Sequence, residues 1–179
     1  MRESKAQYIQ FCHSNYVPMQ LQPWWLDAVC TPESWDVAIA KDAGGNMIGV
    51  LPWFKKRRWG LPVVQMPPLS TYAGPWLLYP ETPGFKLQSR YTFEKKVCTD
   101  LIKQLPETAF FLQNFRPELT NWLPFYWEGF RQSTRYTYVF DQIKDPEEIT
   151  AGMKNTLRSD MKKAAQVCEY HREDQNWET

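Results

Sequence analysis

Residues 35–54 read WDVAIAKDAGGNMIGVLPWF, which is two apolar segments separated by a cluster of turn-forming residues. The first segment, residues 35–40, alternates in a way that predicts a β-strand, and residues 47–54 predict a second strand. Residues 42–46 between them are typical of a tight turn, since glycine accepts the positive φ angles that hairpin turns require. The stretch therefore predicts a β-hairpin.

The hairpin is flanked by a short aromatic helix and by a run of positive charge. Residues 23–29, Pro-Trp-Trp-Leu-Asp-Ala-Val, predict a helix whose aromatic side faces inward. Residues 55–58 are four consecutive cations, Lys-Lys-Arg-Arg, and we interpret them as the exposed end of a hairpin. The alternative is attraction to an anionic membrane surface, to which each cation near the lipid contributes about 1 kcal/mol.

Residues 59–80 contain no charged residue, but they do not have the character of a membrane-spanning helix. They include five prolines and two glycines, whereas a span needs a nearly continuous helix of about 20 residues. We expect irregular chain and short strands here, and no transmembrane segment. The N-terminus also lacks an apolar stretch typical of a signal peptide, so the expected location is cytoplasmic.

The next segments predict a helix, a buried strand and one more helical turn. An apolar stripe with one polar member, Glu94, predicts a helix that ends before Pro106; its residues are Leu87, Tyr91, Glu94, Cys98, Leu101, Ile102 and Leu105. Residues 109–112, Ala-Phe-Phe-Leu, form a continuous apolar run that predicts a buried strand. Residues 117–122 predict a helical turn.

The last third of the chain predicts a strand and two helices. Residues 131–141 alternate, with Thr134, Tyr136, Tyr138 and Phe140 on one side, and predict a half-covered strand. Asp145-Pro146-Glu147-Glu148 is a strong helix start, because aspartate caps and proline fits the first helical position. A second helix is predicted for residues 155–168. Its apolar stripe consists of Met153, Leu157, Met161, Ala164 and Cys168.

These elements and the composition together predict a mixed α/β protein. Its 179 residues are 43% hydrophobic and 16% aromatic, which excludes a disordered chain, and they suffice for one sizeable core. We expect a single domain over residues 1–168, followed by a polar tail, residues 169–179, where a further element would begin. The formal net charge of +1 argues against a dedicated DNA-binding protein.

The cysteines and histidines predict neither a metal site nor a covalent nucleophile. The four cysteines are widely spaced without a Cys-x-x-Cys pair, and the two histidines, His13 and His171, have no partner at ligand spacing. We therefore interpret the cysteines as free thiols.

Three segments in order resemble the GNAT-like acyl-CoA N-acyltransferase superfamily, and within it the Fem-type peptidoglycan aminoacyltransferases and their acetyltransferase relatives. The resemblance extends from about residue 23 to residue 165 and matches only the first of the two halves that such proteins usually have. It implies a mostly antiparallel sheet flanked by helices. The segments are residues 23–52, residues 66–76 (MPPLSTYAGPW), and residues 136–141 with 153–164 (MKNTLRSDMKKA).

The resemblance implies acyl or aminoacyl transfer to an amine or hydroxyl of a cell-envelope precursor. The donor would be acyl-CoA or aminoacyl-tRNA, with no tightly bound cofactor. The second half usually supplies the donor site, so we expect this chain to bind the acceptor and to be incomplete as a catalyst. Gly44-Gly45 is a hairpin turn rather than a phosphate-binding loop, because a strand follows it instead of a helix. The catalytic residues stay unknown.

Five residues are candidates for binding the acceptor. Tyr72 and Gly74 lie where the resembled family lines its acceptor cleft, although Tyr72 is equally typical of a protein core. Lys154, Arg158 and Lys162 recur every four residues and would bind a diphosphate or another anionic group. The alternative for these three is the solvated face of an amphipathic helix.

Two other functions remain open. A non-catalytic interaction module would keep the fold and form a homodimer through exposed aromatic side chains or an unpaired sheet edge. A single-stranded RNA binder would combine aromatic and basic residues, but the near-zero net charge makes it the least favoured.

Overall fold

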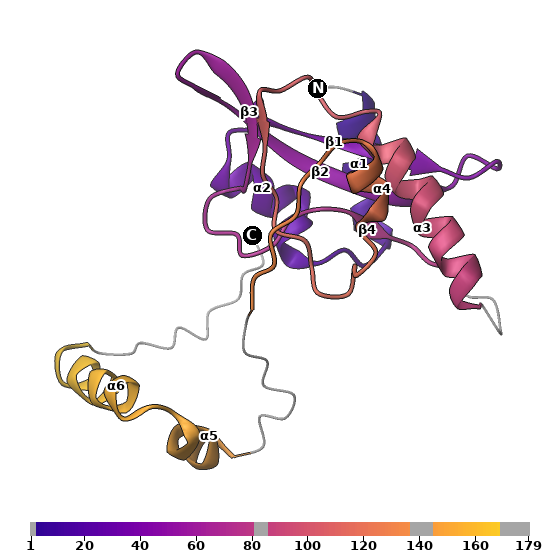
Figure 1. Ribbon diagram of the computed structural model, residues 1–179. Helices are drawn as coiled ribbons and strands as arrows, with labels where there is room; N and C mark the ends of the chain where they lie inside the picture. Colours follow the sequence, from indigo (N-terminus) through magenta and orange to yellow (C-terminus); the bar gives the residue numbers. More distant parts are fainter. Residues whose placement is uncertain (1–2, 81–85, 137–144, 169–179) are drawn as a thin grey trace. The chain divides into compact units, whose positions relative to one another are not determined.

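The computed structural model describes residues 3–80, 86–136 and 145–168 (Figure 1). The chain divides into two compact units, residues 1–133 and residues 134–179. The single domain predicted for residues 1–168 stays a prediction. None of the described helices is both long enough and apolar enough to cross a membrane.

The first unit combines helices with a sheet of five strands among its described residues. In chain order its elements are α1 (Glu3–Ser14), η1 (Met19–Leu21), α2 (Pro23–Val29), β1 (Trp35–Lys41), β2 (Met47–Arg58), β3 (Leu61–Gln65), β4 (Trp76–Leu77), α3 (Leu87–Ile102), β5 (Phe110–Phe111) and α4 (Leu123–Trp127).

The sheet is mostly antiparallel, and its strands follow the order β1-β2-β3-β5, with β4 paired to β2. Strands β1, β3 and β4 each run antiparallel to β2, whereas β5 runs parallel to β3. The predicted class, a mixed α/β protein with a mostly antiparallel sheet flanked by helices, is confirmed.

The predicted hairpin of residues 35–54 is present as β1 and β2. The Asp42 N–H donates to the Asn46 carbonyl over 2.9 Å, and Gly45 has φ +83°, a conformation that favours glycine. The Asp42 carboxylate accepts the N–H groups of Gly44 and Asn46, each at 2.9 Å. Its hydrogen bonds, above all the one from the Asn46 side chain, lower the pKa of Asp42.

Strand β2 continues beyond the predicted strand through the four cations to Arg58, and β3 pairs back along it. The turn between them is Trp59-Gly60, with φ +50° and +78°. Two consecutive positive φ angles are the signature of a type I′ hairpin turn. The prediction that the basic run forms the exposed end of a hairpin is therefore confirmed.

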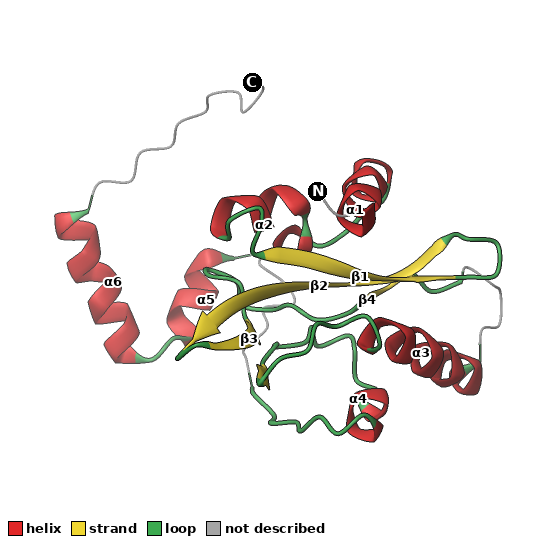
Figure 2. Cartoon of the chain, turned by 90° about the horizontal axis from the view of Figure 1, so that it is seen from above, coloured by secondary structure: helices red, strands yellow, loops and turns green. Residues whose placement is uncertain are grey.

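Helices cover both faces of the sheet (Figure 2). Because side chains alternate along a strand, Trp35, Val37 and Ile39 pack with α1 and α2 on one face. Ala38 and Ala40 belong to the cluster that includes α3 and α4 on the other face. The predicted helix of residues 23–29 is α2, with Leu26 buried, but the expectation that its aromatic side faces inward is wrong for Trp24, which is 58% exposed.

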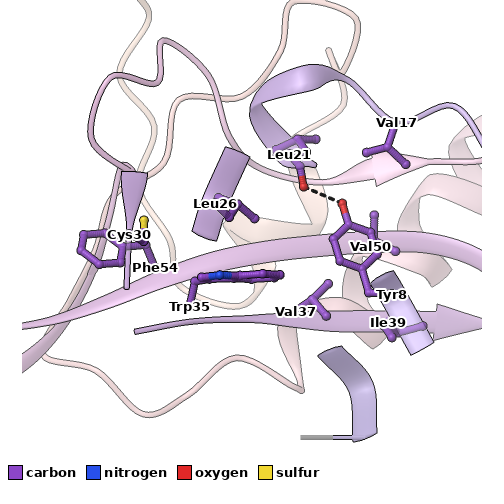
Figure 3. Packing of buried hydrophobic residues seen from close by; sticks show 10 residues of the cluster. All are labelled: Tyr8, Val17, Leu21, Leu26, Cys30, Trp35, Val37, Ile39, Val50 and Phe54. Atoms are coloured by element: carbon purple, nitrogen blue, oxygen red, sulfur yellow. Dashed lines mark hydrogen bonds between the residues drawn. The ribbon is translucent and has the colours of Figure 1, made fainter. Parts of the chain in front are cut away.

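The core on the α1–α2 side encloses the hydroxyl group of Tyr8. Figure 3 shows this side chain among the buried residues, with its hydroxyl donating to the Leu21 carbonyl over 2.8 Å. A buried tyrosine hydroxyl needs such a partner. Burial also raises the pKa of Tyr8 well above its usual value. The bond ties α1 to η1.

Helix α3 confirms the C-terminal part of the predicted stripe and lies close to the sheet, but Leu87 and Tyr91 at its start are 61% and 47% exposed, and Leu105 lies beyond the helix. Val97, Cys98 and Leu101 are fully buried. A Cβ placed on Gly49 of β2 would lie 2.4 Å from Val97 Cγ1, closer than packed atoms approach. The missing side chain at Gly49 therefore sets the distance between helix and sheet.

The one polar member of that stripe, Glu94, is buried within an ionic network. Its Oε1 accepts hydrogen bonds from the Tyr79 hydroxyl and from Arg90 Nε, both at 2.7 Å. Burial, followed by the bond to Glu94, raises the pKa of Tyr79 to about 12. A buried carboxylate needs such compensation, so Glu94 belongs to the packing of α3.

The strand predicted for residues 109–112 exists as β5, but the expectation that it is buried is wrong. Phe110 is 56% exposed. The described sheet ends at β5, so one edge of this strand has no neighbour on the sheet path. A continuous apolar run cannot distinguish a central strand from such an edge.

Two other predicted elements differ from the structure. Residues 117–122 form no helix; α4 begins at Leu123, where Pro124 fits the first turn. Residues 131–136 form no strand and are exposed, while residues 137–141 of that prediction lie outside the described residues. Alternation predicts a strand only where a neighbouring strand supplies hydrogen bonds.

The second unit contains α5 (Pro146–Gly152) and α6 (Asn155–Val167), which confirm the two predicted helices. The Asp145 carboxylate accepts the Glu147 N–H over 2.8 Å, as expected of an N-cap. In the described chain no side chain of α6 is buried. Leu157 and Met161 of its apolar stripe are 50% and 46% exposed.

Candidate functional site

Tyr72 and Gly74 lie in the segment between β3 and β4, which is held in place by a glutamine from η1. The Oε1 of Gln20 accepts hydrogen bonds from the N–H groups of Thr71 and Tyr72, at 2.8 and 3.1 Å. A side-chain carbonyl that receives two successive backbone donors fixes the path of the loop. These hydrogen bonds therefore fix the backbone position of Tyr72 within the first unit.

Gly74 brings this segment against the chain that follows β5. Its φ is +92°, and a Cβ there would lie 2.4 Å from Phe115 Cδ1, so only glycine fits without displacement. One residue earlier, the Ala73 N–H donates to the Asn114 carbonyl over 2.7 Å. Gly74 is thus a packing residue that allows two segments to lie side by side.

The close approach of the Gly74 segment to the chain after β5 places Arg116 against two aromatic rings. The centre of its guanidinium lies 4.9 Å from the Tyr72 ring and 5.4 Å from the Trp76 ring, both within cation–π distance. We call Tyr72, Trp76 and Arg116 the Arg116 cluster. Its members come from segments that are forty residues apart in the sequence.

In the described structure, only some of the N–H groups of the Arg116 guanidinium have a hydrogen-bond acceptor. Its Nη2 donates to Glu118 Oε1 over 2.7 Å, in an ion pair whose carboxylate side is exposed. Its Nε is buried and has no hydrogen-bond partner among the described residues. A buried donor without an acceptor is unfavourable, so this nitrogen would gain from an added acceptor.

The cluster is bordered by an exposed tyrosine. The Tyr16 ring packs edge-on against the Trp76 ring at a centroid distance of 5.9 Å, although most of the Tyr16 side chain is exposed. Trp25 Nε1 of α2 donates over 2.9 Å to Ser70 Oγ, in the loop that carries Tyr72. Aromatic faces beside a guanidinium can stack on a sugar or peptide while the charge binds an anion.

The other three predicted site residues, Lys154, Arg158 and Lys162, lie at the start and along α6 in the second unit. Arg158 donates to the Asn155 side chain within the same helix. Both lysines are exposed, and Lys163 beside them is 3.9 Å from Asp160. Their predicted role in binding an anionic acceptor stays a prediction.

A separate cavity of about 640 Å³ lies beside β1 and is lined by residues of α1, β1 and β2. Lys5 Nζ donates to the Pro32 carbonyl over 2.7 Å and to Asp27 Oδ1 over 3.3 Å, and it lies 3.7 Å above the Trp35 ring. These contacts tie α1 to α2 and β1. The indole N–H of Trp53, also on the cavity wall, has no acceptor in the described structure.

Three thiols are poorly suited to nucleophilic chemistry, because a cysteine reacts as the thiolate. Burial raises the pKa of Cys98 to about 12 and those of Cys12 and Cys30 to about 11. Among the residues with described positions, no group of three or more His, Cys, Asp or Glu side chains could hold a metal ion.

Sequence reasoning identified Tyr72 but not Arg116. The arginine follows a short strand and precedes a proline, a context that carries no binding motif. Only the close packing at Gly74 brings it to the aromatic rings.

Comparison of the chain with protein-family models, with curated proteins and with solved structures finds no match.

Proposed function

We propose that the first unit binds the acceptor in an acyl or aminoacyl transfer to a cell-envelope precursor. The sequence resemblance to Fem-type and GNAT-like transferases supplies the reaction class. The observation that carries the proposal is the Arg116 guanidinium, which lies over two aromatic rings and keeps a buried N–H without an acceptor. An anionic sugar or peptide would bind the part of this guanidinium that is exposed, which is 19% of the side chain.

The donor, acyl-CoA or aminoacyl-tRNA, is proposed to bind outside this unit. A CoA pyrophosphate is usually held by backbone N–H groups at a glycine-rich turn. At Gly44-Gly45, the N–H groups of Gly44 and Asn46 already donate to the Asp42 carboxylate. A phosphate there would meet a negative charge, so this turn is unsuited to holding the donor.

The acceptor proposal is tested by titrating the chain with UDP-N-acetylglucosamine, an amino sugar that carries a diphosphate. Arg116→Gln removes the charge and is expected to weaken binding roughly tenfold to a hundredfold. The matched control is Arg131→Gln, which removes an exposed arginine. Equal affinity of the two variants, or no binding by the unmodified chain, would contradict the proposal.

The absence of a donor site is tested by thermal unfolding with acetyl-CoA. A ligand that binds the folded state raises its melting temperature. We expect acetyl-CoA to leave the melting temperature unchanged. A concentration-dependent increase would show that this chain holds the donor by itself.

A second candidate is a non-catalytic interaction module that forms a homodimer. It is favoured by the large aromatic side chains that α3 and α4 leave exposed, including Tyr91, Tyr126 and Trp127. Sedimentation velocity over a range of concentrations tests it. A dimer that dissociates in a Tyr91→Ser/Trp127→Ser variant would support this module, and a monomer at all concentrations would exclude it.

A further inference from the structure

The end of the β2–β3 hairpin concentrates positive charge. We call residues 55–61, Lys-Lys-Arg-Arg-Trp-Gly-Leu, the basic hairpin tip; none of them is acidic. Arg58 pairs with Leu61 and Lys56 with Val63, so Lys56, Arg58 and Leu61 share one face of the ribbon. Arg57 lies on the opposite face, so cations surround the hairpin.

Two large apolar side chains lie exposed among these cations. Trp59 is 87% exposed and Leu61 is 54% exposed. The only described ring contact of Trp59 is with its neighbour Arg58, whose guanidinium lies 4.5 Å from the ring. In Figure 1 the hairpin beside the label β3 projects from the sheet of the first unit.

The turn itself gives no structural reason for a tryptophan. Type I′ turns favour asparagine or glycine, because both central residues have positive φ. Trp59 adopts φ +50°, which is unfavourable for a bulky residue, and its ring is not packed in the core. The tip is instead fixed by Arg57 Nη2, which donates to the Gly60 carbonyl over 2.6 Å. Strain retained at an exposed position points to a function outside the fold.

The β1–β2 turn provides an internal comparison. It belongs to the same sheet, yet it carries the Asp42 carboxylate and small or polar residues, with Gly45 at a positive φ. That turn has the composition expected of a hairpin that only reverses the chain. The basic hairpin tip departs from it in both charge and exposed apolar surface.

We propose that the basic hairpin tip is a peripheral docking site for an anionic lipid bilayer. Trp59 and Leu61 enter the interfacial region of the bilayer, where tryptophan is favoured because its ring is apolar and its N–H is polar. The cations bind lipid phosphates around it. This inference does not depend on the proposed acceptor binding, because it involves none of the same residues.

The apolar side chains favour a bilayer over a nucleic acid. A single-stranded nucleic acid would stack its bases on Trp59 and bind the cations, but it has no apolar region into which the Leu61 side chain could insert. Phe110, the β5 residue paired with Val63, adds another exposed apolar side chain beside the hairpin. A surface of mixed apolar and basic side chains is typical of interfacial membrane binding.

The test is co-sedimentation of the full chain with vesicles of phosphatidylcholine containing phosphatidylglycerol. Trp59→Asn suits the turn and should preserve the fold, but we expect it to weaken binding about tenfold, as expected for a large apolar side chain. Lys56→Gln/Arg58→Gln is expected to weaken it roughly twenty-five-fold. Lys96→Gln/Lys103→Gln, which removes two exposed charges from α3 and its C-terminal end, is the charge-matched control and should bind nearly normally.

Quenching by brominated lipid supplies a second readout. Part of the tryptophan fluorescence should be quenched on anionic vesicles, and that part should be missing in Trp59→Asn. No binding to anionic vesicles, or equal binding to vesicles of phosphatidylcholine alone, would overturn the proposal. Tighter binding to oligo-uridine than to vesicles, unaffected by Leu61→Ser, would identify a nucleic-acid site instead.

Discussion

Helices α3 and α6 each carry an apolar stripe, but only the stripe of α3 is covered by the described residues of its own unit. In α3, Val97, Cys98 and Leu101 are fully buried against the sheet and α4. In α6, Leu157 and Met161 are about half exposed, and no side chain of the helix is buried in the described chain. The pattern of apolar residues therefore predicts a helix, but it does not say whether a partner surface is present.

The largest expected difference between the helices is in thiol reactivity. Cys98 on α3 is fully buried, whereas Cys168 at the end of α6 is exposed. Because a buried thiol reacts only after local opening, we expect the native chain to label at Cys168 about a thousandfold faster or more. Mass spectrometry of timed samples would measure the two rates. Similar rates would mean that α3 opens as freely as the end of α6. That result would contradict the difference in burial between Cys98 and Cys168.

Truncation of one large side chain on each helix compares their contribution to stability. Leu101→Ala is expected to lower the free energy of unfolding by about 2–5 kcal/mol, because it leaves a cavity. Met161→Ala, at a half-exposed position, should change it by less than about 0.5 kcal/mol. Urea denaturation measures both. A large loss for Met161→Ala would show that α6 packs against a surface in solution.

Because α3 lies close to the sheet, we expect Gly49→Ala to lower the free energy of unfolding, but by less than Leu101→Ala does. The added Cβ would meet Val97 Cγ1, and overpacking of this kind usually costs about 1–3 kcal/mol. Val97→Ala removes the clashing methyl group, so the double variant should lose less than the sum of the two single changes. Strict additivity in urea denaturation would contradict the contact.

Alkaline pH should weaken the first unit through Cys98. Burial raises the pKa of this thiol from its usual 9 to about 12, so the native state keeps its proton while the unfolded state loses it. The stabilisation is complete below pH 9 and falls by about 1.4 kcal/mol per pH unit above it, until the native thiol ionises. Tyr79 acts in the same direction at higher pH.

The control for this pH dependence is Cys98→Ala, which removes the titrating group. Its free energy of unfolding, measured by urea denaturation at several pH values, should fall less steeply above pH 9. An unchanged slope would mean that Cys98 ionises as readily in the folded chain as in the unfolded one.

The smallest expected effect concerns the cap of α5. Asp145→Ala removes the acceptor of the Glu147 N–H and should destabilise that helix by about 1 kcal/mol. Amide exchange of the first turn measures the local loss, while the unfolding midpoint of the first unit should not move. A shift of that midpoint would show that the two units unfold together.

Local signals predicted several elements correctly. The glycines at the β1–β2 turn, Pro23 at the start of α2 and Asp145 before α5 each restrict the backbone within a few residues, so a short stretch is sufficient evidence. Elements that depend on neighbours were predicted less well. Residues 109–112 were expected in a buried strand but form an edge, and residues 117–122 contain no helix.

Of the candidate site, the sequence identified Tyr72 and Gly74 through a family resemblance. It could not predict that Arg116 lies against the Tyr72 ring, since that contact depends on two loops that meet at Gly74 and Phe115. The buried Nε of Arg116 is also invisible in sequence, because burial is a property of all the surrounding chain.

By itself, the sequence determined the class of the protein, the β1–β2 hairpin and the positions of α2, α3, α5 and α6, because these follow from local backbone preferences and the spacing of apolar residues. Only the tertiary structure decided which apolar stripe is covered, which strand forms the edge and which arginine joins the aromatic rings. Those outcomes depend on contacts between residues far apart in the chain, and no short stretch of sequence contains them.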